Sequence, residues 1–186
     1  MTLNEMKSLS PKEQEALFNR LTLERHKGKT TNYASTYNAG AQTIATGAGT
    51  TLKEGKELHK SYWLRNWSIK AIADEQVVKQ VNGLMWMFNP VSKFWYILRS
   101  DKDRFSTLNQ GTATFCFDMW LKEVRKHTDM FLGQFHDEVI IEVRKGRRAN
   151  IRMMLDDCVM EVNKRLELNR ELTVGVDFGR DYSEIH

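Results

Sequence analysis

An acidic turn between two apolar runs is the feature of this chain best suited to chemistry. His136-Asp137-Glu138 separates Phe131–Phe135 from Val139–Val143, and both runs favour β-strands. A hairpin would hold the Asp137 carboxylate at its tip, where a divalent cation can reach it. Magnesium takes hard oxygen ligands and keeps several waters, so a protein need supply only a few carboxylates. The alternative is an ordinary surface turn with solvated charges.

A basic and aromatic series in the first quarter of the chain is the second such feature. Arg25, Lys29, Tyr33 and Tyr37 follow one another at steps of four residues, which places them on one face of a helix. Two cations can neutralise a triphosphate, and an aromatic ring can pack on a sugar or base. We therefore predict a nucleotide-binding helix over about 24–45. The alternative is a surface helix with both tyrosines turned inward and the cations solvated.

The elements that position these residues follow from apolar periodicity and from breaker residues. Ser10 and Pro11 predict the start of a helix that continues to about Leu23, with serine as N-cap and proline in the first turn. The other predicted elements are one or two helices over Leu52–Val81, a hairpin over Gly83–Leu98 with its turn at Asn89–Ser92, an amphipathic helix over Gly111–Lys126, a helix over Arg148–Leu166 and a short strand over Leu172–Asp177.

Composition sets broad limits on the class of protein. The 186 residues carry a net charge of +4 and a pI near 9.0, which mildly favours a polyanionic partner. Cys116 and Cys158 have no metal-ligand spacing, so we expect them to be reduced core residues. No apolar run reaches the roughly 18 residues that a membrane span needs, and the first residues are polar. We expect a soluble, intracellular protein with no membrane partner.

Four segments together resemble family A (polymerase I-like) DNA polymerases of phage type. The series Arg25-x3-Lys29-x3-Tyr33-x3-Tyr37 resembles the fingers helix of that family, and His136-Asp137-Glu138 resembles its palm metal-site motif. Gln110-Gly111-Thr112-Ala113 resembles its Q-G-T-A segment. Gly179 to His186 is similar to the family ending, a glycine followed by an aromatic residue and a terminal histidine. The resemblance runs from about Leu21 to His186, with the motifs in the family's order.

The resemblance implies roles for the predicted helix. Arg25 and Lys29 would hold the triphosphate of an incoming deoxynucleotide, Lys29 also acting in catalysis. Tyr33 would stack against the nucleotide, and Tyr37 would lie beside the nascent base pair. The family usually has glycine after each aromatic residue. Here Ala34 and Asn38 stand at those positions, and asparagine tolerates unusual backbone angles better than most residues.

It also implies roles around the hairpin. Asp137 would be a ligand of a two-magnesium site that stabilises charge during phosphoryl transfer, with Glu138 tuning the site from its edge. His136 would contact the primer backbone. Gln110 would touch the minor groove of the primer-template. The alternative is that Gln110 only marks the start of a helix. Ser106 stands where the family commonly has a second groove-contacting asparagine.

One part of the family's site has no counterpart in this sequence. The other metal aspartate of the family lies upstream of the fingers helix in an Asp-x-Ser-like strand, and nothing before Arg25 resembles it. Asp177 is the only other aspartate on a predicted strand. It falls in a segment that has a structural role in the family, and the alternative is that Asp177 is a metal ligand. One aspartate cannot hold two dications, so we expect the isolated chain to be inactive. A naturally split polymerase is the favoured explanation, and a truncated piece is the other.

These inferences combine into one expectation for fold and function. The fold is α+β, with a mostly helical fingers subdomain over 1–100 and a partial palm over 101–186 that carries the Asp137 hairpin. The chain would be the C-terminal part of a DNA-directed DNA polymerase, a nucleotidyltransferase in bacterial or phage-infected host cytoplasm. It would use Mg²⁺, deoxynucleoside triphosphates, primer-template DNA and an N-terminal polymerase fragment carrying the other aspartate. The alternative is a non-catalytic nucleic-acid-binding protein, or an inactive fragment, derived from a polymerase.

Overall fold

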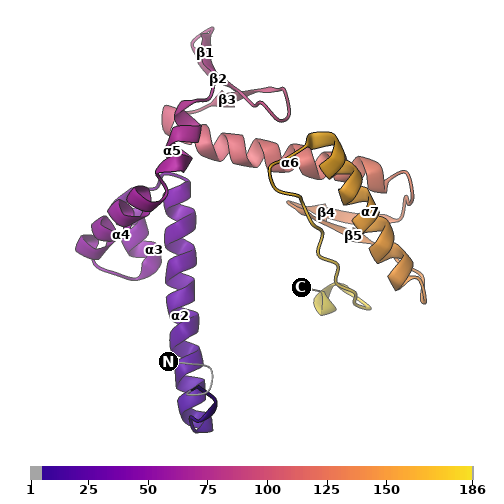
Figure 1. The fold of residues 1–186 in the computed structure, drawn as a ribbon, viewed down its shortest axis with the longest axis horizontal. Coiled ribbons are helices and arrows are strands. Elements are labelled where there is room, and N and C mark those ends of the chain that lie inside the picture. The colour runs from indigo at the N-terminus through magenta and orange to yellow at the C-terminus, as the bar shows by residue number, and fades with distance from the viewer. Residues whose placement is uncertain (1–5, 186) are drawn as a thin grey trace. The chain divides into compact units, whose positions relative to one another are not determined.

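The chain folds into helices and two small antiparallel sheets (Figure 1), as a computed structural model of residues 6–185 describes. The predicted α+β class is confirmed. Residues 1–5 and the terminal His186 of the family-like ending lie outside the described residues. Two compact units divide the chain: the first takes the chain up to Phe88 together with Trp95–Leu108, and the second takes Asn89–Phe94 together with the chain from Asn109 onward.

The first long helix, α2, runs Pro11–Thr36 without a break. Its start agrees with the prediction: Glu13 accepts hydrogen bonds from the backbone N–H of Ser10 at 2.8 Å and from its hydroxyl at 2.6 Å. This capping arrangement satisfies groups that the first turn leaves without helical partners. The predicted boundary near Leu23 is wrong, since one helix replaces the two that were expected.

The end of α2 corrects the prediction of a helix over 24–45. Asn38 adopts a left-handed backbone conformation with φ of 57°. Its N–H donates to the carbonyl of Ser35 at 2.9 Å, and the N–H of Ala39 donates to that of Ala34 at 2.8 Å. This pair of bonds is a Schellman motif, which closes a helix by satisfying its last carbonyls. Tyr37 is consequently the C-cap of α2.

Three shorter helices complete the helical part of the first unit. They are α3 (Ala41–Ala48), α4 (Leu52–Arg65) and α5 (Trp67–Asp74). Helices α3 and α4 approach closely at Gly55, where an added β-carbon would lie 2.6 Å from both Ala41 O and Ala45 Cβ. Ile44 and Ala45 of α3 are buried there. Helices α3 and α4 lie beside the C-terminal half of α2, and its first half extends beyond them (Figure 1).

A three-stranded antiparallel sheet follows α5. Its strands are β1 (Val78–Val81), β2 (Leu84–Phe88) and β3 (Trp95–Leu98), with β2 in the centre. The prediction that helix continues to Val81 is therefore wrong. Asn82 and Gly83 both have positive φ, 52° and 77°, which matches the two-residue turn that an Asn-Gly pair favours between strands.

The predicted turn at Asn89–Ser92 is confirmed, and a buried amide organises it. The Asn89 side chain is fully buried, and its Oδ1 accepts the N–H groups of Val91 at 2.9 Å and Ser92 at 3.1 Å. Its Nδ2 donates to Thr112 Oγ1 at 2.9 Å. The side chain thus replaces backbone partners that the turn itself cannot supply.

Helix α6 runs Arg104–Val124, directly after a short 3-10 helix at Asp101–Asp103. The prediction of a start at Gly111 is wrong. Arg104 Nε donates to the Asp101 carboxylate at 2.8 Å, and the helix continues through Gly111 at a cost of about 1 kcal/mol relative to alanine.

The core of the second unit forms between α6 and α7 (Arg148–Leu166). Helix α7 has the predicted bounds, and Cys158 on its buried face and Cys116 on α6 are both free and buried, as predicted. The core residues are Trp120, Leu121 and Val124 of α6 with Leu155, Cys158, Val159 and Val162 of α7.

The predicted hairpin is confirmed as β4 (Phe131–Phe135) and β5 (Glu138–Ile141), which pair antiparallel. The predicted strand over Leu172–Asp177 is wrong, because no strand forms there. Leu172, Val174 and Val176 still pack on the core. The backbone of this segment forms hydrogen bonds with side chains of α7 and not with a neighbouring strand. Asn163 bonds both polar backbone groups of Leu172 at 2.8 Å, and Arg152 donates to Val176 O at 2.8 Å.

Within the described residues, no helix combines the length and the apolar character needed to cross a membrane.

Candidate functional site

The basic and aromatic series lies on the solvent side of α2. Tyr33 is 53% exposed and Tyr37 is 39% exposed, whereas Ser35 on the opposite side is fully buried. Arg25 and Lys29 are exposed as well. The alternative in which both tyrosines turn inward is therefore wrong, and the series faces solvent.

The buried side of α2 explains this orientation. An added β-carbon at Gly47 of α3 would lie 2.8 Å from Thr30 Cγ2, so α3 packs closely on α2 at this point. Further along, Thr36 Oγ1 lies 2.6 Å from the hydroxyl of Tyr62 on α4. Contacts on this side fix the rotation of the last turns of α2, and with it the outward direction of Tyr33.

The cations of the series are available to a ligand. Lys29 Nζ lies 5.8 Å from the centroid of the Tyr33 ring, within the range of a cation–π contact. Lys27, on another side of the helix, pairs with Glu24 at 3.4 Å. Among residues 6–185, no carboxylate forms an ion pair with Arg25 or Lys29.

The spacing of the series suits an extended anion. Residues four apart on a helix are displaced by about 6 Å along its axis. Arg25, Lys29 and Tyr33 therefore present a planar fork, a point charge and a ring in that order along one direction. Arginine grips phosphate oxygens in a bidentate manner and lysine acts as a compact charge. The arrangement can hold a polyphosphate with an aromatic group at one end.

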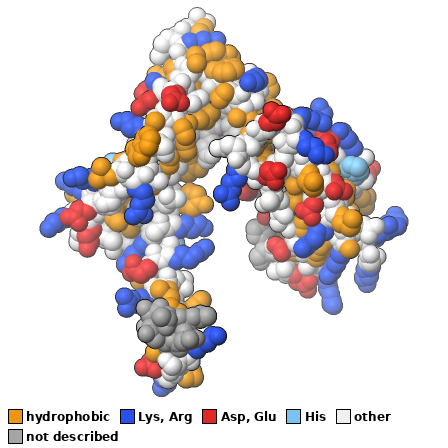
Figure 2. Space-filling view, in the orientation of Figure 1, with side chains coloured by type: hydrophobic (Ala, Val, Ile, Leu, Met, Phe, Trp, Pro, Cys, Tyr) orange, Lys and Arg blue, Asp and Glu red, His pale blue; other side chains and the backbone are white. Residues whose placement is uncertain are grey.

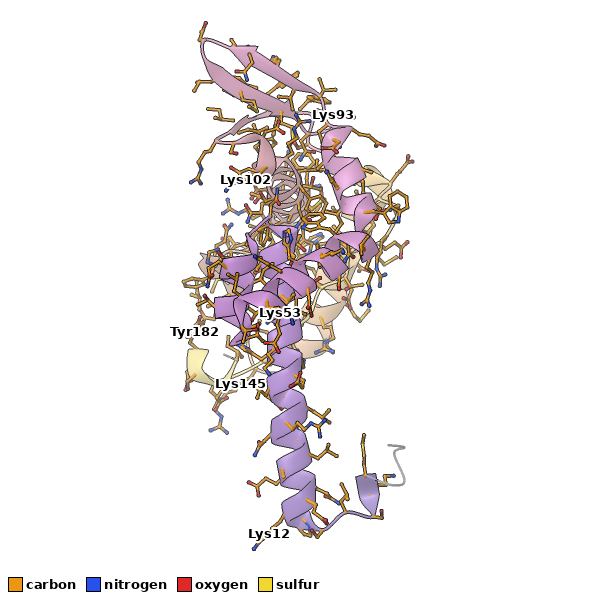
Figure 3. The ribbon with its side chains drawn as sticks, turned by 90° about the vertical axis from the view of Figure 1, so that its left-hand side faces the viewer. Lys12, Lys53, Lys93, Lys102, Lys145 and Tyr182 are labelled. Atoms are coloured by element: carbon orange, nitrogen blue, oxygen red, sulfur yellow. The ribbon has the colours of Figure 1, made fainter. Side chains whose placement is uncertain are left out.

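Along the first half of α2 the side chains project freely, Lys12 among them (Figure 3).

The hairpin tip is a two-residue turn made of His136 and Asp137. Phe135 pairs with Glu138 across it. His136 has φ of 50°, in the left-handed region that non-glycine residues enter rarely, although histidine does so more often than most. Asp137 follows with its side chain exposed, and Glu138 is half-buried. The turn therefore presents the Asp137 carboxylate to solvent.

Neighbouring residues support this tip. The Phe135 ring lies 6.1 Å from the ring of Tyr182, centroid to centroid. Asp181 accepts bonds from the Ser183 N–H at 3.0 Å and from its hydroxyl at 2.7 Å. The bond from the Ser183 hydroxyl is the main reason that the pKa of Asp181 lies below its ordinary value. Asp181 therefore braces the short turn that carries Tyr182.

The residues at the tip can supply one metal ligand but not a complete metal site. Asp137 offers a hard oxygen donor of the kind that Mg²⁺ takes. Among the described residues, no group of three or more His, Cys, Asp or Glu side chains lies close enough together to hold a metal ion. Asp177 is exposed and lies in the extended C-terminal segment. Any dication bound at Asp137 would need further ligands.

Gln110 lies well inside α6 and is exposed. The alternative that it merely starts a helix is wrong, since α6 begins at Arg104. Its side chain is exposed on a regular helix, so its amide can contact a ligand. Ser106, one turn earlier, donates its hydroxyl to the carbonyl of Asp103 at 2.9 Å, which commits that group within the helix.

The predicted residues form two local sets. Arg25, Lys29 and Tyr33 share α2 in the first unit, with Tyr37 at its C-cap. Gln110, His136, Asp137 and Glu138 belong to the second unit, where the last three form the hairpin tip.

An exposed aromatic surface on the β1–β3 sheet was missed from the sequence. Trp86, Phe88 and Trp95 alternate along two adjacent strands. The alternation of Leu84, Trp86 and Phe88, which follows the Asn-Gly pair, was the signal that could have found it.

Comparison with known protein families and with curated proteins finds no match to this chain.

Proposed function

We propose that the chain is the C-terminal part of a family A DNA polymerase, in which α2 is the fingers helix and the β4–β5 hairpin belongs to the palm. In this role it binds an incoming deoxynucleoside triphosphate and provides one of two metal-binding aspartates. The enzyme is active only when a partner supplies the other aspartate and most contacts to the DNA duplex.

The outward face of α2 is the observation that carries the proposal. Arg25, Lys29 and Tyr33 are exposed on one side of a helix whose other side is packed. The helix ends at Tyr37, and Asn38 adopts a left-handed conformation. The family that the sequence resembles usually has glycine at that position, and glycine is the residue that adopts this conformation most readily. The local backbone thus agrees with the resemblance at a position where the residue type differs.

The side chains of α2 then have distinct tasks. Arg25 and Lys29 neutralise the triphosphate, and Lys29 also stabilises charge that develops as the phosphoryl group transfers. Tyr33 stacks against the nucleotide, and Tyr37 lies beside the new base pair. Each task requires an exposed side chain that the rest of the protein does not engage in an ion pair.

The hairpin contributes a positioned carboxylate. Asp137 holds one side of a magnesium site, Glu138 adjusts the charge at its edge, and His136 lies where it can contact the primer backbone. When bound, the metal pair stabilises charge on the attacking and leaving oxygens. Gln110 contacts the minor groove of the primer-template from α6.

A non-catalytic nucleic-acid-binding protein is the second candidate. The exposed cations of α2 and the net charge of +4 favour it equally, because both attract a polyanion whether or not a metal pair forms.

Primer extension separates the two candidates. The full chain is incubated with primer-template, Mg²⁺ and deoxynucleotides, alone and with an N-terminal palm and thumb fragment of a family A polymerase. Extension only in the mixture supports the polymerase. Binding of DNA without extension in either reaction supports the non-catalytic protein.

Two matched pairs of variants make this test specific. Asp137→Asn should abolish extension, whereas Asp177→Asn, which changes another exposed aspartate, should not. Arg25→Ala should weaken nucleotide use, whereas Arg20→Ala, which removes an exposed arginine from another side of α2, should leave it unchanged. Equal effects within either pair would contradict the assigned roles.

A further inference from the structure

One face of the β1–β3 sheet gathers aromatic and aliphatic side chains outside both sets of residues described above. The strand register places Lys79 opposite Trp86 and Trp86 opposite Ile97, while Phe88 lies opposite Trp95. Directly paired residues share a face of a sheet, so these five side chains lie on the same side. We name them, with Val81 and Leu84, the outer face of the sheet.

The opposite face contains the buried residues of the sheet. Met87 is fully buried and Leu98 is 4% exposed, and the register puts both on the side away from Trp86. One side of the sheet therefore packs on protein, as antiparallel sheets commonly do. The outer face is the solvent side, where an apolar surface needs another explanation.

Exposure on the outer face is substantial. Trp95 is 36% exposed, Leu84 is 47% exposed and Ile97 is 51% exposed. Trp86 and Phe88 are half-buried. In the space-filling view, hydrophobic side chains gather in this part of the molecule, with basic and acidic side chains beside them (Figure 2). Three aromatic side chains thus share the solvent side of the sheet, and each is at least partly exposed.

The charges on these strands and directly after them are positive. Lys79 is the only charged residue within the three strands, and Arg99 follows β3 directly. Lys79 Nζ lies 3.7 Å from the centroid of the Trp95 ring, and the Phe88 ring lies 5.3 Å from that ring at an angle of 53°. An ammonium group and a row of rings are therefore held together in one small area.

We propose that the outer face binds single-stranded nucleic acid. Bases stack on Trp95 and Trp86, and Lys79 and Arg99 contact the phosphates. Sheets that bind single strands combine rings for the bases with cations for the backbone, and stacking tolerates any sequence because every base has a π-face. None of these residues has a role in the proposed polymerase site, so this surface can bind nucleic acid whether or not the chain is part of a polymerase.

The contact between Lys79 and Trp95 is compatible with this ligand. At an exposed position a cation–π contact stabilises less than the stacking of a base on an aromatic ring. An arriving base therefore displaces the ammonium group from the ring, and the freed charge moves to the adjacent phosphate. The absence of acidic residues on the three strands disfavours basic partners.

Fluorescence anisotropy of a labelled oligothymidylate of about 16 nucleotides, the upper end of common site sizes, tests the proposal with the full chain. Trp95→Ala should weaken binding by about tenfold, the effect expected for losing one stacked base. Trp67→Ala is the matched control, because it removes a tryptophan that is 70% exposed on α5, and it should bind as the unchanged protein does. Trp95→Phe keeps a ring and should recover most of the affinity.

Charge provides a second readout that does not depend on removing an aromatic ring. Lys79→Ala changes an exposed side chain. The decrease of log affinity with log salt should become shallower by about 0.7, the value for one phosphate contact on a single strand. Lys79→Glu should leave the fold intact and weaken binding further, since it adds a repelling charge. In an Arg25→Ala background, Trp95→Ala and Lys79→Ala should still weaken binding of the oligothymidylate by the same factors, which separates this surface from the proposed nucleotide site.

Three results would overturn the proposal. They are failure of the unchanged protein to bind the oligothymidylate, equal binding by folded Trp95→Ala and Trp67→Ala, and a salt slope that Lys79→Ala does not alter. Binding of a protein partner in place of nucleic acid, lost with Trp95→Ala, would likewise show that the outer face is a protein docking surface.

Discussion

Thr36 Oγ1 lies 2.6 Å from the hydroxyl oxygen of Tyr62 and 2.7 Å from the carbonyl of Asn32. One hydroxyl therefore joins the last turn of α2 to α4 while remaining bonded within its own helix. Tyr62 is 8% exposed, so its polar group reaches this partner from a largely buried position. The bond contributes to holding the outward direction of Tyr33.

Removing the hydroxyl of Tyr62 should cost a moderate amount of stability. Tyr62→Phe leaves Thr36 bonded to Asn32, so no buried polar group is stranded, and the free energy of unfolding should fall by about 0.5–1.5 kcal/mol. Urea unfolding measures this. Tyr33→Phe, which removes an exposed hydroxyl, is the control and should change stability by less than about 0.5 kcal/mol. Equal losses in the two variants would show that the bond to Thr36 contributes nothing.

Two glycine substitutions should have effects of opposite sign. At Gly55 an added β-carbon would lie 2.6 Å from Ala41 O and Ala45 Cβ, so Gly55→Ala should destabilise by about 1–3 kcal/mol through overpacking. At Gly28 nothing lies within 4 Å, and the residue is inside α2. Gly28→Ala should therefore stabilise by about 0.5–1 kcal/mol. Thermal unfolding of both variants checks the pair, and a stabilised Gly55→Ala would contradict the close approach of α3 and α4.

The end of α2 should depend on the backbone freedom of residue 38. At φ of 57°, alanine pays about 1–2 kcal/mol and asparagine pays less, because asparagine tolerates this region better, so Asn38→Ala should lower the free energy of unfolding by up to about 1 kcal/mol. Asn38→Gly should change it by less than about 0.5 kcal/mol. Chemical denaturation distinguishes the two. If alanine and glycine behave alike, the Schellman motif does not determine where α2 ends.

Stability should fall in acid through Glu123. This buried carboxylate pairs with Lys126 and lies 2.9 Å from Arg165 Nη2. The bond from Lys126 is the main reason that its pKa lies below the ordinary value of 4.5. Because the folded-state pKa is lower than the unfolded one, the contribution is complete above pH 4.5 and is lost as pH falls through the folded value.

Glu123→Gln is the variant that isolates this effect, since glutamine keeps the size of the side chain without titrating. The stability difference between the unchanged protein and Glu123→Gln should be constant near neutral pH and should shrink in acid. Urea midpoints measured across the pH range test this. A difference that grows as pH falls would mean that folding raises the pKa of Glu123 instead of lowering it.

Sequence patterns correctly predicted the helices and turns whose own residues determine their structure. Helix α7 has its predicted bounds because its apolar residues recur at helical spacing, and the turn at Asn89 forms because asparagine supplies its own partners. Strand β1 was predicted as helix, since Val78 and Val81 also fit helical spacing. The Asn82-Gly83 pair was the feature that distinguishes the two, because it favours a hairpin turn.

Other features depended on contacts between segments and were not accessible from one sequence. The alternation of Leu172, Val174 and Val176 correctly indicates an extended chain, but pairing requires a neighbouring strand, and α7 lies there instead. The spacing of Arg25 to Tyr37 predicted a shared face on α2. Its outward direction follows from the packing of Thr30 and Thr36 on other helices.

The bonds between Asn163 and Leu172 have a consequence for how the C-terminal segment is aligned. The amide of Asn163 engages the N–H and the carbonyl of one residue, as a neighbouring strand would. A slip by one residue would break both bonds and would turn Thr173 and Gly175 toward the core in place of Leu172 and Val174. Asn163 thus helps to set the alignment of the segment that leads to Tyr182 beside Phe135. The aromatic ring next to the Asp137 turn is therefore positioned in part by polar side chains of α7, Asn163 at Leu172 and Arg152 at Val176.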